Sequence, residues 1–368
     1  MRSKRMITGL AGIAALVALP LLQAQENGAP AAVANGYSEP ATQTAEVLPL
    51  SEQSLLLGFA ETDQRAIVVG ARGAILVSES RSDWRQLEGV PTRSTLTAVA
   101  AVGNQAWAVG HDQVILHSVD GGLTWERQHA APFSDDNVDD PRNGAPFLGV
   151  HFDDADTGFA VGAYGLMMRT GDAGANWTSV PITAQSEAEA DEEVVGEADD
   201  SWTFSDEDLM LEEESNPHLN GIAATSSGAL FVAAERGSAY RSRDGGLTWE
   251  RLQLPYDGSM FGVIGYEAEH VLLYGLRGHV FESMDLGDTW KEVSTGTELS
   301  LQGGAALNGS GAVLVGSNGL LAWRGSAEDD FQTVKLADAG SLASVLPVGG
   351  SGQLVCAGEN GIINHAIR

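Results

Sequence analysis

An eight-residue pattern recurs along this chain of 368 residues and constrains its fold more than any other feature. The copies read SVDGGLTW, TGDAGANW, SRDGGLTW and SMDLGDTW, at residues 118–125, 170–177, 242–249 and 283–290. Trp84 and Trp125 are 41 residues apart, and so are Trp249 and Trp290. A period of about 40 residues made of short apolar stretches is typical of the blades of a β-propeller.

A second marker counts the blades without reference to the first. Each unit has an apolar stretch, a four-residue turn that approximates G-x-x-G, and another apolar stretch. The turns occupy residues 70–73, 110–113, 162–165, 234–237, 275–278, 316–319 and 358–361. Glycine accepts the positive φ that tight turns between strands need. Seven such units predict an all-β, seven-bladed β-propeller over residues 45–368.

The two ends of this region predict how the ring closes. The last unit reaches Arg368 soon after its third apolar stretch, so its fourth strand is missing. Residues 45–52, AEVLPLSE, resemble the fourth strands of the other units. We therefore expect residues 45–52 to form the outermost strand of the last blade, which would remove an open sheet edge.

The first 24 residues have the pattern of a cleaved signal peptide. Arg2, Lys4 and Arg5 precede a short apolar run, and the small residue Ala24 marks the expected cleavage site. We therefore expect export to the periplasm, with residues 25–44 as a linker to the propeller. An uncleaved membrane anchor is the alternative interpretation of the same run.

The chain is strongly acidic. Its formal net charge is −30, and it falls to −33 once the three cations of the signal peptide are removed. Such a surface repels nucleic acid and anionic lipid, so we expect neither as a direct partner and only indirect association with a membrane. A charged partner would be basic or would meet a local patch of opposite sign.

Two insertions interrupt the repeat. One lies near residues 131–146, and the other, at residues 184–216, carries fourteen acidic residues and no basic one. The acidic segment is either a solvated loop or an arm that contacts a partner. Both insertions join a fourth strand to the next first strand, so both should overhang the same face.

Asp135 to Asp140 superficially resembles a calcium loop but lacks the glycine and glutamate of the EF-hand pattern, and we expect no metal site and no cofactor.

The recurrent pattern predicts a structural role for its own residues. The serine or threonine and the aspartate can bond backbone N–H groups of the turn between strands three and four. The tryptophan can serve as a large apolar anchor between blades. We assign this role to Asp120, Trp125, Asp172, Trp177, Asp244, Trp249, Asp285 and Trp290.

The turns between strands two and three supply the candidate binding surface. They place side chains on the face that propellers commonly use for ligands, and three of these side chains are arginines in a chain with only 20 cations. Arginine is favoured where a fork of donors meets a carboxylate. The alternative is that the tips of these turns are simply exposed and polar. The candidate residues are Arg72, Tyr164, Arg236, Arg277 and Asn318.

The S-x-D-x-G-x-T-W pattern resembles the Asp box, or bacterial neuraminidase repeat, which is found first of all in sialidases. That resemblance implies an arginine triad, a tyrosine nucleophile with a glutamate, and an acidic aspartate. The seven segments expected as inner strands contain no arginine. We therefore expect no enzymatic activity and no catalytic residues, and keep a sialidase-like glycoside hydrolase as the alternative.

Units such as TGFAVGAYGLMMRTGDAGANW, residues 157–177, are similar to those of the photosystem II stability and assembly factor family and its bacterial relatives. The resemblance covers residues 45–368 apart from the insertions. It implies a non-enzymatic, chaperone-like factor in photosynthesis, or an exported bacterial relative that is sometimes encoded beside large exporters. We expect a monomer that binds a protein partner, as a scaffold or as an assembly factor for a membrane complex or exporter.

Overall fold

The computed structural model describes residues 39–182 and 217–367. The expected signal peptide, most of the expected linker and the acidic segment at 184–216 lie outside these residues. The chain divides into a unit at Met1–Tyr37 and a second unit at Ser38–Arg368, and the described residues all belong to the second. Within them, no helix is both long and apolar enough to span a membrane.

Seven antiparallel sheets make up the second unit, and the strands of each sheet follow one another along the chain. The first blade contains β1 (Leu56–Glu61), β2 (Ala66–Gly70), β3 (Ile75–Ser78) and β4 (Arg85–Gln86). The second contains β5 (Leu96–Val102), β6 (Gln105–Gly110), β7 (Ile115–Ser118) and β8 (Glu126–His129). The third contains β9 (Phe147–Phe152), β10 (Gly158–Gly162), β11 (Met167–Thr170) and β12 (Thr178–Ser179).

The remaining blades repeat this arrangement until the last. The fourth contains β13 (Leu219–Ala224), β14 (Leu230–Ala234), β15 (Ser238–Ser242) and β16 (Glu250–Gln253). The fifth contains β17 (Met260–Gly265), β18 (Val271–Gly275), β19 (Val280–Ser283) and β20 (Lys291–Glu292). The sixth contains β21 (Leu301–Ala306), β22 (Ala312–Gly316), β23 (Leu320–Arg324) and β24 (Gln332–Lys335). The seventh contains β25 (Leu342–Val348), β26 (Gln353–Gly358) and β27 (Gly361–Ala366).

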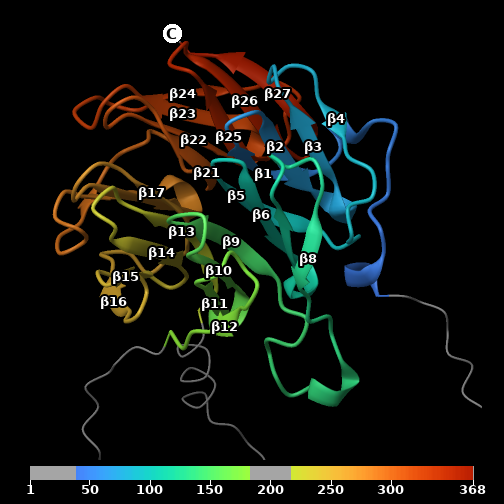
Figure 1. Cartoon of the computed structure of the whole chain (residues 1–368). Coiled ribbons are helices and arrows are strands. Elements are labelled where there is room, and N and C mark those ends of the chain that lie inside the picture. The colour runs from blue at the N-terminus through green and yellow to red at the C-terminus, as the bar shows by residue number, and fades with distance from the viewer. Residues whose placement is uncertain (1–38, 183–216, 368) are drawn as a thin grey trace, which may run out of the picture. The chain divides into compact units, whose positions relative to one another are not determined.

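The first strand of each sheet is the innermost, because each first strand contacts the first strands of both neighbouring sheets. The series closes where β25 contacts β1, and there the backbone N–H of Phe59 donates to Ser344 Oγ at 3.2 Å. Figure 1 shows the sheets around a common centre. The expected fold class, an all-β seven-bladed β-propeller, is confirmed.

The expected closing strand is absent from the structure. Residues 45–52 contain no strand, and the described part of the seventh blade ends at β27. Residues 45–48 instead run beside the first blade, where the N–H of Ala45 donates to Val90 O and the N–H of Leu48 donates to Gln86 Oε1, both at 2.9 Å. These bonds satisfy backbone groups that a strand would have used, so the ring closes through packing of β1 on β25.

Part of the expected linker packs on the propeller. The 3₁₀ turn η1 (Pro40–Thr42) buries Ala41 completely. The carbonyl of Pro40 accepts from the N–H of Arg93 at 2.8 Å, and that of Ala41 accepts from Arg127 Nη1 at 2.7 Å. Residues 39–53, which we call the strap, also include η2 (Ser51–Gln53), and η2 contacts β27.

Close backbone approach explains the glycine at the end of the second strand. A Cβ on Gly316 would lie 2.0 Å from Ser300 O, and one on Gly70 would lie 2.2 Å from Leu55 O. In each case the contact is the backbone that leads into the inner strand of the same blade. A larger residue here forces apart the pair of strands that lines the middle of the ring.

Gly316→Ala is expected to lower the free energy of unfolding by about 1–3 kcal/mol, because the new methyl group meets backbone atoms that cannot rotate away. Gly171→Ala is the control, since its Cβ would lie 4.0 Å from the nearest atom and its φ is not positive. That change should stay within about 0.5 kcal/mol. Urea unfolding measures both. Equal midpoints for the two variants would show that close packing does not select this glycine.

Candidate functional site

Antiparallel strand order gives the propeller two distinct faces. The turn after the second strand and, in the six four-stranded blades described, the link after the fourth strand lie at one end of the blade. The turn after the first strand and, in those six blades, the turn after the third strand lie at the other end. We call the first the turn face and the second the Asp-box face. The insertion at residues 131–146 lies on the turn face, where Gln113 Nε2 donates to Arg142 O at 2.7 Å.

Five of the turns on the turn face share one conformation. The 3₁₀ turns are η3 (Ala71–Gly73), η4 (His111–Gln113), η6 (Ala163–Gly165), η7 (Leu276–Gly278) and η8 (Ser317–Gly319). The middle residue of each is left-handed, with φ between 56° and 58° at Arg72, Asp112, Tyr164, Arg277 and Asn318. The fourth blade has no such 3₁₀ turn, yet Arg236 has φ 56°.

This conformation is costly for most of these residue types. The left-handed region costs a residue with a side chain about 1–2 kcal/mol, and asparagine less than most. Arginine and tyrosine therefore occupy positions where glycine would be the cheapest choice. Left-handed φ values also occur at Ala173 and Leu286 on the opposite face. The recurrence of a polar side chain at this position, together with the φ value, therefore motivates a hypothesis of function.

The five candidate residues lie at equivalent, exposed tips. Tyr164, Arg236, Arg277 and Asn318 come from the third to the sixth blades and form an arc along the turn face. Arg72 is on the first blade, separated from that arc on both sides by another blade. The structure thus places all five on one face and brings four of them into consecutive blades.

Their surroundings differ. Arg72 Nη1 lies 3.4 Å from Glu46 Oε2 on the strap, in an ion pair with both side chains exposed. The ring of Tyr164 stands edge-on to His218, with centroids 4.8 Å apart. In the second blade, Asp112 is held inward because it accepts from Ser94 Oγ.

A groove beside Arg277 adds residues that sequence reasoning missed. It has a volume of about 540 Å³, and its walls include Arg277, His279, Glu292 and Glu298. His279 Nδ1 lies 2.6 Å from Glu292 Oε1, and its ring stacks on Tyr256 at 4.0 Å. A guanidinium, an imidazole and two carboxylates therefore line one groove. The sequence feature that could have indicated this groove is His279, which directly follows Gly278 of the turn.

On the other face, the recurrent pattern organises its own turn through hydrogen bonds. Asp120 Oδ1 accepts from Ser118 Oγ at 2.8 Å and from the N–H of Thr124 at 2.9 Å, and Thr124 Oγ1 donates to Asp120 Oδ2 at 2.7 Å. Ser118 Oγ in turn accepts from the N–H of Gly122. The same bonds recur around Asp172, Asp244 and Asp285.

These bonds change the acidity of the aspartates. Burial opposes ionisation of Asp120, but the bonds from Thr124, Ser118 and Leu123 outweigh it and lower the pKa to about 2. The bonds from Thr248 and Ser242 lower the pKa of Asp244 to about 2, and those from Thr289 and Ser283 do the same for Asp285. The pKa of Asp172 is lowered by Asn176 and Thr170.

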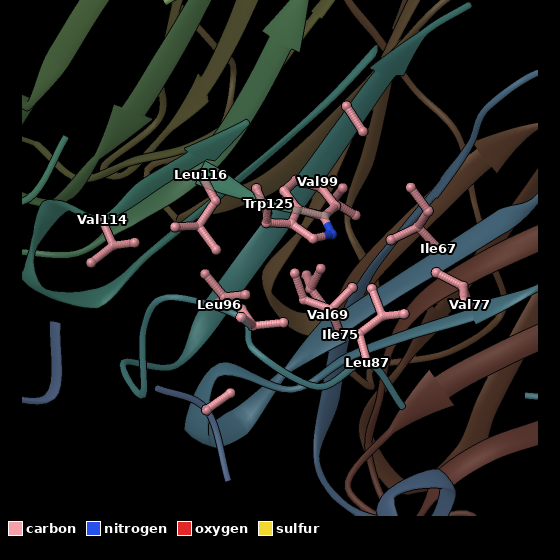
Figure 2. Close-up of a cluster of buried hydrophobic side chains, with 14 of the residues drawn as sticks. Ile67, Val69, Ile75, Val77, Leu87, Leu96, Val99, Val114, Leu116 and Trp125 are labelled. Atoms are coloured by element: carbon pink, nitrogen blue, oxygen red, sulfur yellow. The ribbon is translucent and has the colours of Figure 1, made fainter. Parts of the chain in front are cut away.

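The tryptophans pack into the interfaces between blades. Trp125 is buried against Ile67 and neighbouring side chains of the first blade, as Figure 2 shows, and its Nε1 donates to Gly122 O at 3.0 Å. Trp249 meets Phe159 of the preceding blade edge-on at 6.0 Å. Trp177 and Trp290 are partly buried in the corresponding clusters.

The sequence patterns did not predict the hydrogen bonds that reach these turns from a neighbouring blade. The carbonyl after the aspartate accepts from the preceding blade: Arg65 Nη1 donates to Gly121 O at 2.7 Å, and Gln128 Nε2 donates to Ala173 O at 2.8 Å. Arg241 makes the equivalent bond to Leu286 O. The donors come from different positions in their blades, so no sequence period reveals them.

The inner strands offer little for catalysis. Within the described strands β1, β5, β9, β13, β17, β21 and β25, the titratable side chains are Glu61 and His151. Glu61 is ion-paired with Arg81 at 2.6 Å, and His151 Nε2 lies 3.0 Å from Asp153 Oδ1. The described residues also contain no group of three or more His, Cys, Asp or Glu placed to hold a metal ion.

Asp285→Ala is expected to cost about 1–2 kcal/mol of unfolding free energy at pH 7, because Ser283 and Thr289 lose their acceptor. The folded pKa of about 2 lies below the ordinary value of 3.8, so the carboxylate stabilises the fold above pH 4 and this contribution disappears as pH falls towards 2. Urea unfolding from pH 7 to 2.5 should show the variant and the parent converging. Exposed Asp330 is the control, and an equal loss in Asp330→Ala would argue against this role for Asp285.

Comparison with known proteins supports the fold. No family model and no curated protein matches the sequence. The structure is similar to YCF48 bound to D1 peptide, at 17% identity and a TM-score of 0.62, over 90% of this chain and 100% of that one. It is also similar to YCF48 from Cyanidioschyzon merolae, at 14% identity and a TM-score of 0.61, over 88% of this chain and 97% of that one. Virginiamycin B lyase from Staphylococcus aureus is similar at 10% identity and a TM-score of 0.61, over 88% of this chain and 97% of that one. At these identities the likeness establishes a shared propeller fold.

Proposed function

We propose that this chain is a non-enzymatic, exported scaffold that binds a protein partner through its turn face. The observation that carries the proposal is the repeated left-handed position on that face. Arginine occupies it at Arg72, Arg236 and Arg277, tyrosine at Tyr164 and asparagine at Asn318. Equivalent glycines would make the same turns at lower cost.

The chemistry of these side chains favours an acidic or carboxylate-bearing partner. Arginine bonds carboxylates through two parallel N–H groups, and arginine and tyrosine are enriched among residues that dominate interface energy. The chain has a net charge of −30, and the three arginines are cationic groups on this face that suit a carboxylate. Residues on several blades contact one target only if that target is broad, as a protein surface is.

One of the similar solved propellers supports a protein partner. That propeller, YCF48, was solved with a D1 peptide bound. The shared fold therefore accommodates peptide ligands, and the mixed groove beside Arg277 has groups for both ends of a polar segment. The finer proposal, an assembly or stability factor for a membrane complex, rests on the resemblance of the repeat units to the photosystem II assembly factor family.

We also propose that the protein acts in the periplasm, after removal of residues 1–24. The support is the basic, apolar and small-residue pattern around Arg2, Arg5 and Ala24. Intact mass of the exported protein should fit a chain that begins at Gln25. Retention of the full N-terminus in a membrane fraction would favour the anchor instead.

A sialidase-like hydrolase is the competing function. A retaining hydrolase needs two carboxyl groups about 5–5.5 Å apart. The one carboxylate of the described inner strands, Glu61, is already paired with Arg81. Purified protein should release nothing from aryl sialosides above background. Turnover that Glu61→Gln abolishes would overturn the proposal.

The turn-face arginines are tested with a partner captured from solubilised membranes and identified by mass spectrometry. The variant with Arg72, Arg236 and Arg277 replaced by alanine should bind it at least about 30-fold more weakly, as expected when interface arginines worth about 2 kcal/mol or more are lost. The control replaces Arg85, Arg243 and Lys291, three exposed cations away from the turns, and changes net charge equally. Equal weakening in both variants would mean that only overall charge matters and would refute the site.

A further inference from the structure

The joint between the second and third blades uses a different kind of hydrogen-bond donor from two other joints of the ring. After the first blade the bond to the next Asp-box turn comes from Arg65, and after the fourth blade it comes from Arg241. A guanidinium keeps its charge and its donors over the whole range of physiological pH. After the second blade the donor is the uncharged amide of Gln128, which also contacts the imidazole of His117.

The third blade fixes the orientation of the Gln128 amide. Its Nε2 donates to Ala173 O at 2.8 Å, and its Oε1 accepts from Trp177 Nε1 at 3.4 Å. A carbonyl only accepts and an indole N–H only donates, so the two ends of the amide cannot be exchanged. The second N–H of Nε2 then points to His117 Nδ1, which lies 3.1 Å away and serves as the acceptor.

The other nitrogen of the ring completes the chain of bonds. His117 Nε2 lies 2.9 Å from Gln105 Oε1, and it must carry the proton because Nδ1 is the acceptor. Gln105 Nε2 donates in turn to Ala155 O of the third blade at 3.5 Å. The chain therefore begins and ends on the third blade, with a neutral imidazole of the second blade in the middle.

The surroundings of His117 favour the neutral ring. It is half-buried and stacks on Trp107 with the ring centroids 4.8 Å apart. Burial lowers the pKa of His117, and Glu126, which lies opposite it on β8, acts in the other direction. On the third blade, Asp156 and Asp172 adjoin the two accepting carbonyls in sequence, and the carboxylate of Asp172 accepts bonds within its own turn.

We propose that protonation of His117 loosens the joint between the second and third blades and makes it sensitive to acid. A proton taken up from solvent at Nδ1 places the new N–H against the N–H of Gln128. If the amide rotates to offer its oxygen to the ring, its NH₂ group faces the indole N–H of Trp177, and Ala173 O loses this donor. The conflict is thus passed to the turn at residues 170–177.

One bond at this joint survives the change. Trp107 Nε1 also donates to Ala173 O, at 3.1 Å, and it does not titrate. The turn therefore loosens without leaving the second blade. This response concerns the Asp-box face alone and does not depend on the partner proposed for the turn face.

The direction of the response follows from the lowered pKa. The ordinary pKa of histidine is 6.5, and that of His117 in the folded chain lies below it. The neutral ring therefore stabilises the joint fully above pH 6.5, and this contribution is lost as pH falls from there through the folded pKa.

Amide hydrogen exchange between pH 7.5 and 5, corrected for the intrinsic effect of pH on exchange, tests the proposal. The amides of Gly174 and Asn176 are bonded within the turn, and their corrected rates should rise about tenfold on acidification, which corresponds to a pKa difference of one unit. The equivalent amides of Gly287 and Thr289, in the turn that Arg241 reaches, should keep their rates. No change at Gly174, or an equal change at Gly287, would overturn the proposal.

Two variants assign the response to one ring. His117→Gln keeps a donor and an acceptor but cannot take up the proton, so its turn should exchange at the same corrected rate at both pH values. His111→Gln changes an exposed histidine of the same blade and should respond as the parent does. An unaltered response in His117→Gln would contradict the assignment.

The parent protein decides the matter if His117→Gln does not fold. A nuclear magnetic resonance titration of the His117 ring should give a pKa below 6.5, and at neutral pH its nitrogen shifts should identify the Nε2–H tautomer. A pKa at or above 6.5, or the Nδ1–H tautomer, would overturn the proposal, because Gln128 would then have no acceptor to lose.

Discussion

Apolar packing between neighbouring sheets is the interaction on which the rest of this structure depends. A single four-stranded sheet cannot bury its apolar faces alone, so each blade buries them against its neighbours. The clusters around Trp125 and Trp249 show how this is done, since each joins side chains of two successive blades. The hydrogen-bonded turns around Asp120 and Asp244 hold the tryptophans in place, and carbonyls of several such turns accept bonds from the blade before. The aspartates, conspicuous in the sequence, thus serve the interfaces of the ring.

The Asp-box turns all lie on one face of the propeller, and the turn face is opposite to them. The turns after the second strands touch the first strand of the next blade, and they keep a left-handed residue with a large polar side chain at Arg72, Tyr164 and Arg277. Stability alone would favour glycine or asparagine there, and only Asn318 follows that preference. The arrangement is consistent with one face that builds the ring and another that meets a partner.

Much of the fold could be predicted from the sequence, because each repeat of the sequence period forms one blade of the propeller. The spacing of the tryptophans and of the G-x-x-G turns was enough to count seven blades. Antiparallel topology then placed Arg236 and Arg277 on the same face. The prediction of a closing strand at residues 45–52 was wrong, because an apolar pattern typical of strands does not say which sheet edge a segment will join. Side-chain and backbone bonds to the first blade, such as that from Leu48 to Gln86, decided the outcome.

The missed features of the candidate site have a similar cause. The cross-blade bonds from Arg65 and Gln128 join residues far apart in sequence and without a common period. The left-handed φ at Arg72 and Tyr164 also has no signature in residue type, since neither arginine nor tyrosine favours it. The groove beside Arg277 combines residues of one turn with a link more than ten positions later. Such sites depend on three-dimensional contacts that local patterns do not encode.

The central claim is that the turn face meets a protein partner, and site-specific photo-crosslinking in the living cell tests it most directly. A photoreactive phenylalanine derivative would replace Tyr164 on the turn face or Leu247, a 71% exposed residue on the Asp-box face. The account predicts a discrete adduct with another protein from position 164 and none from position 247. An adduct from position 247 alone would contradict it, because the partner would then bind the face assigned to structure.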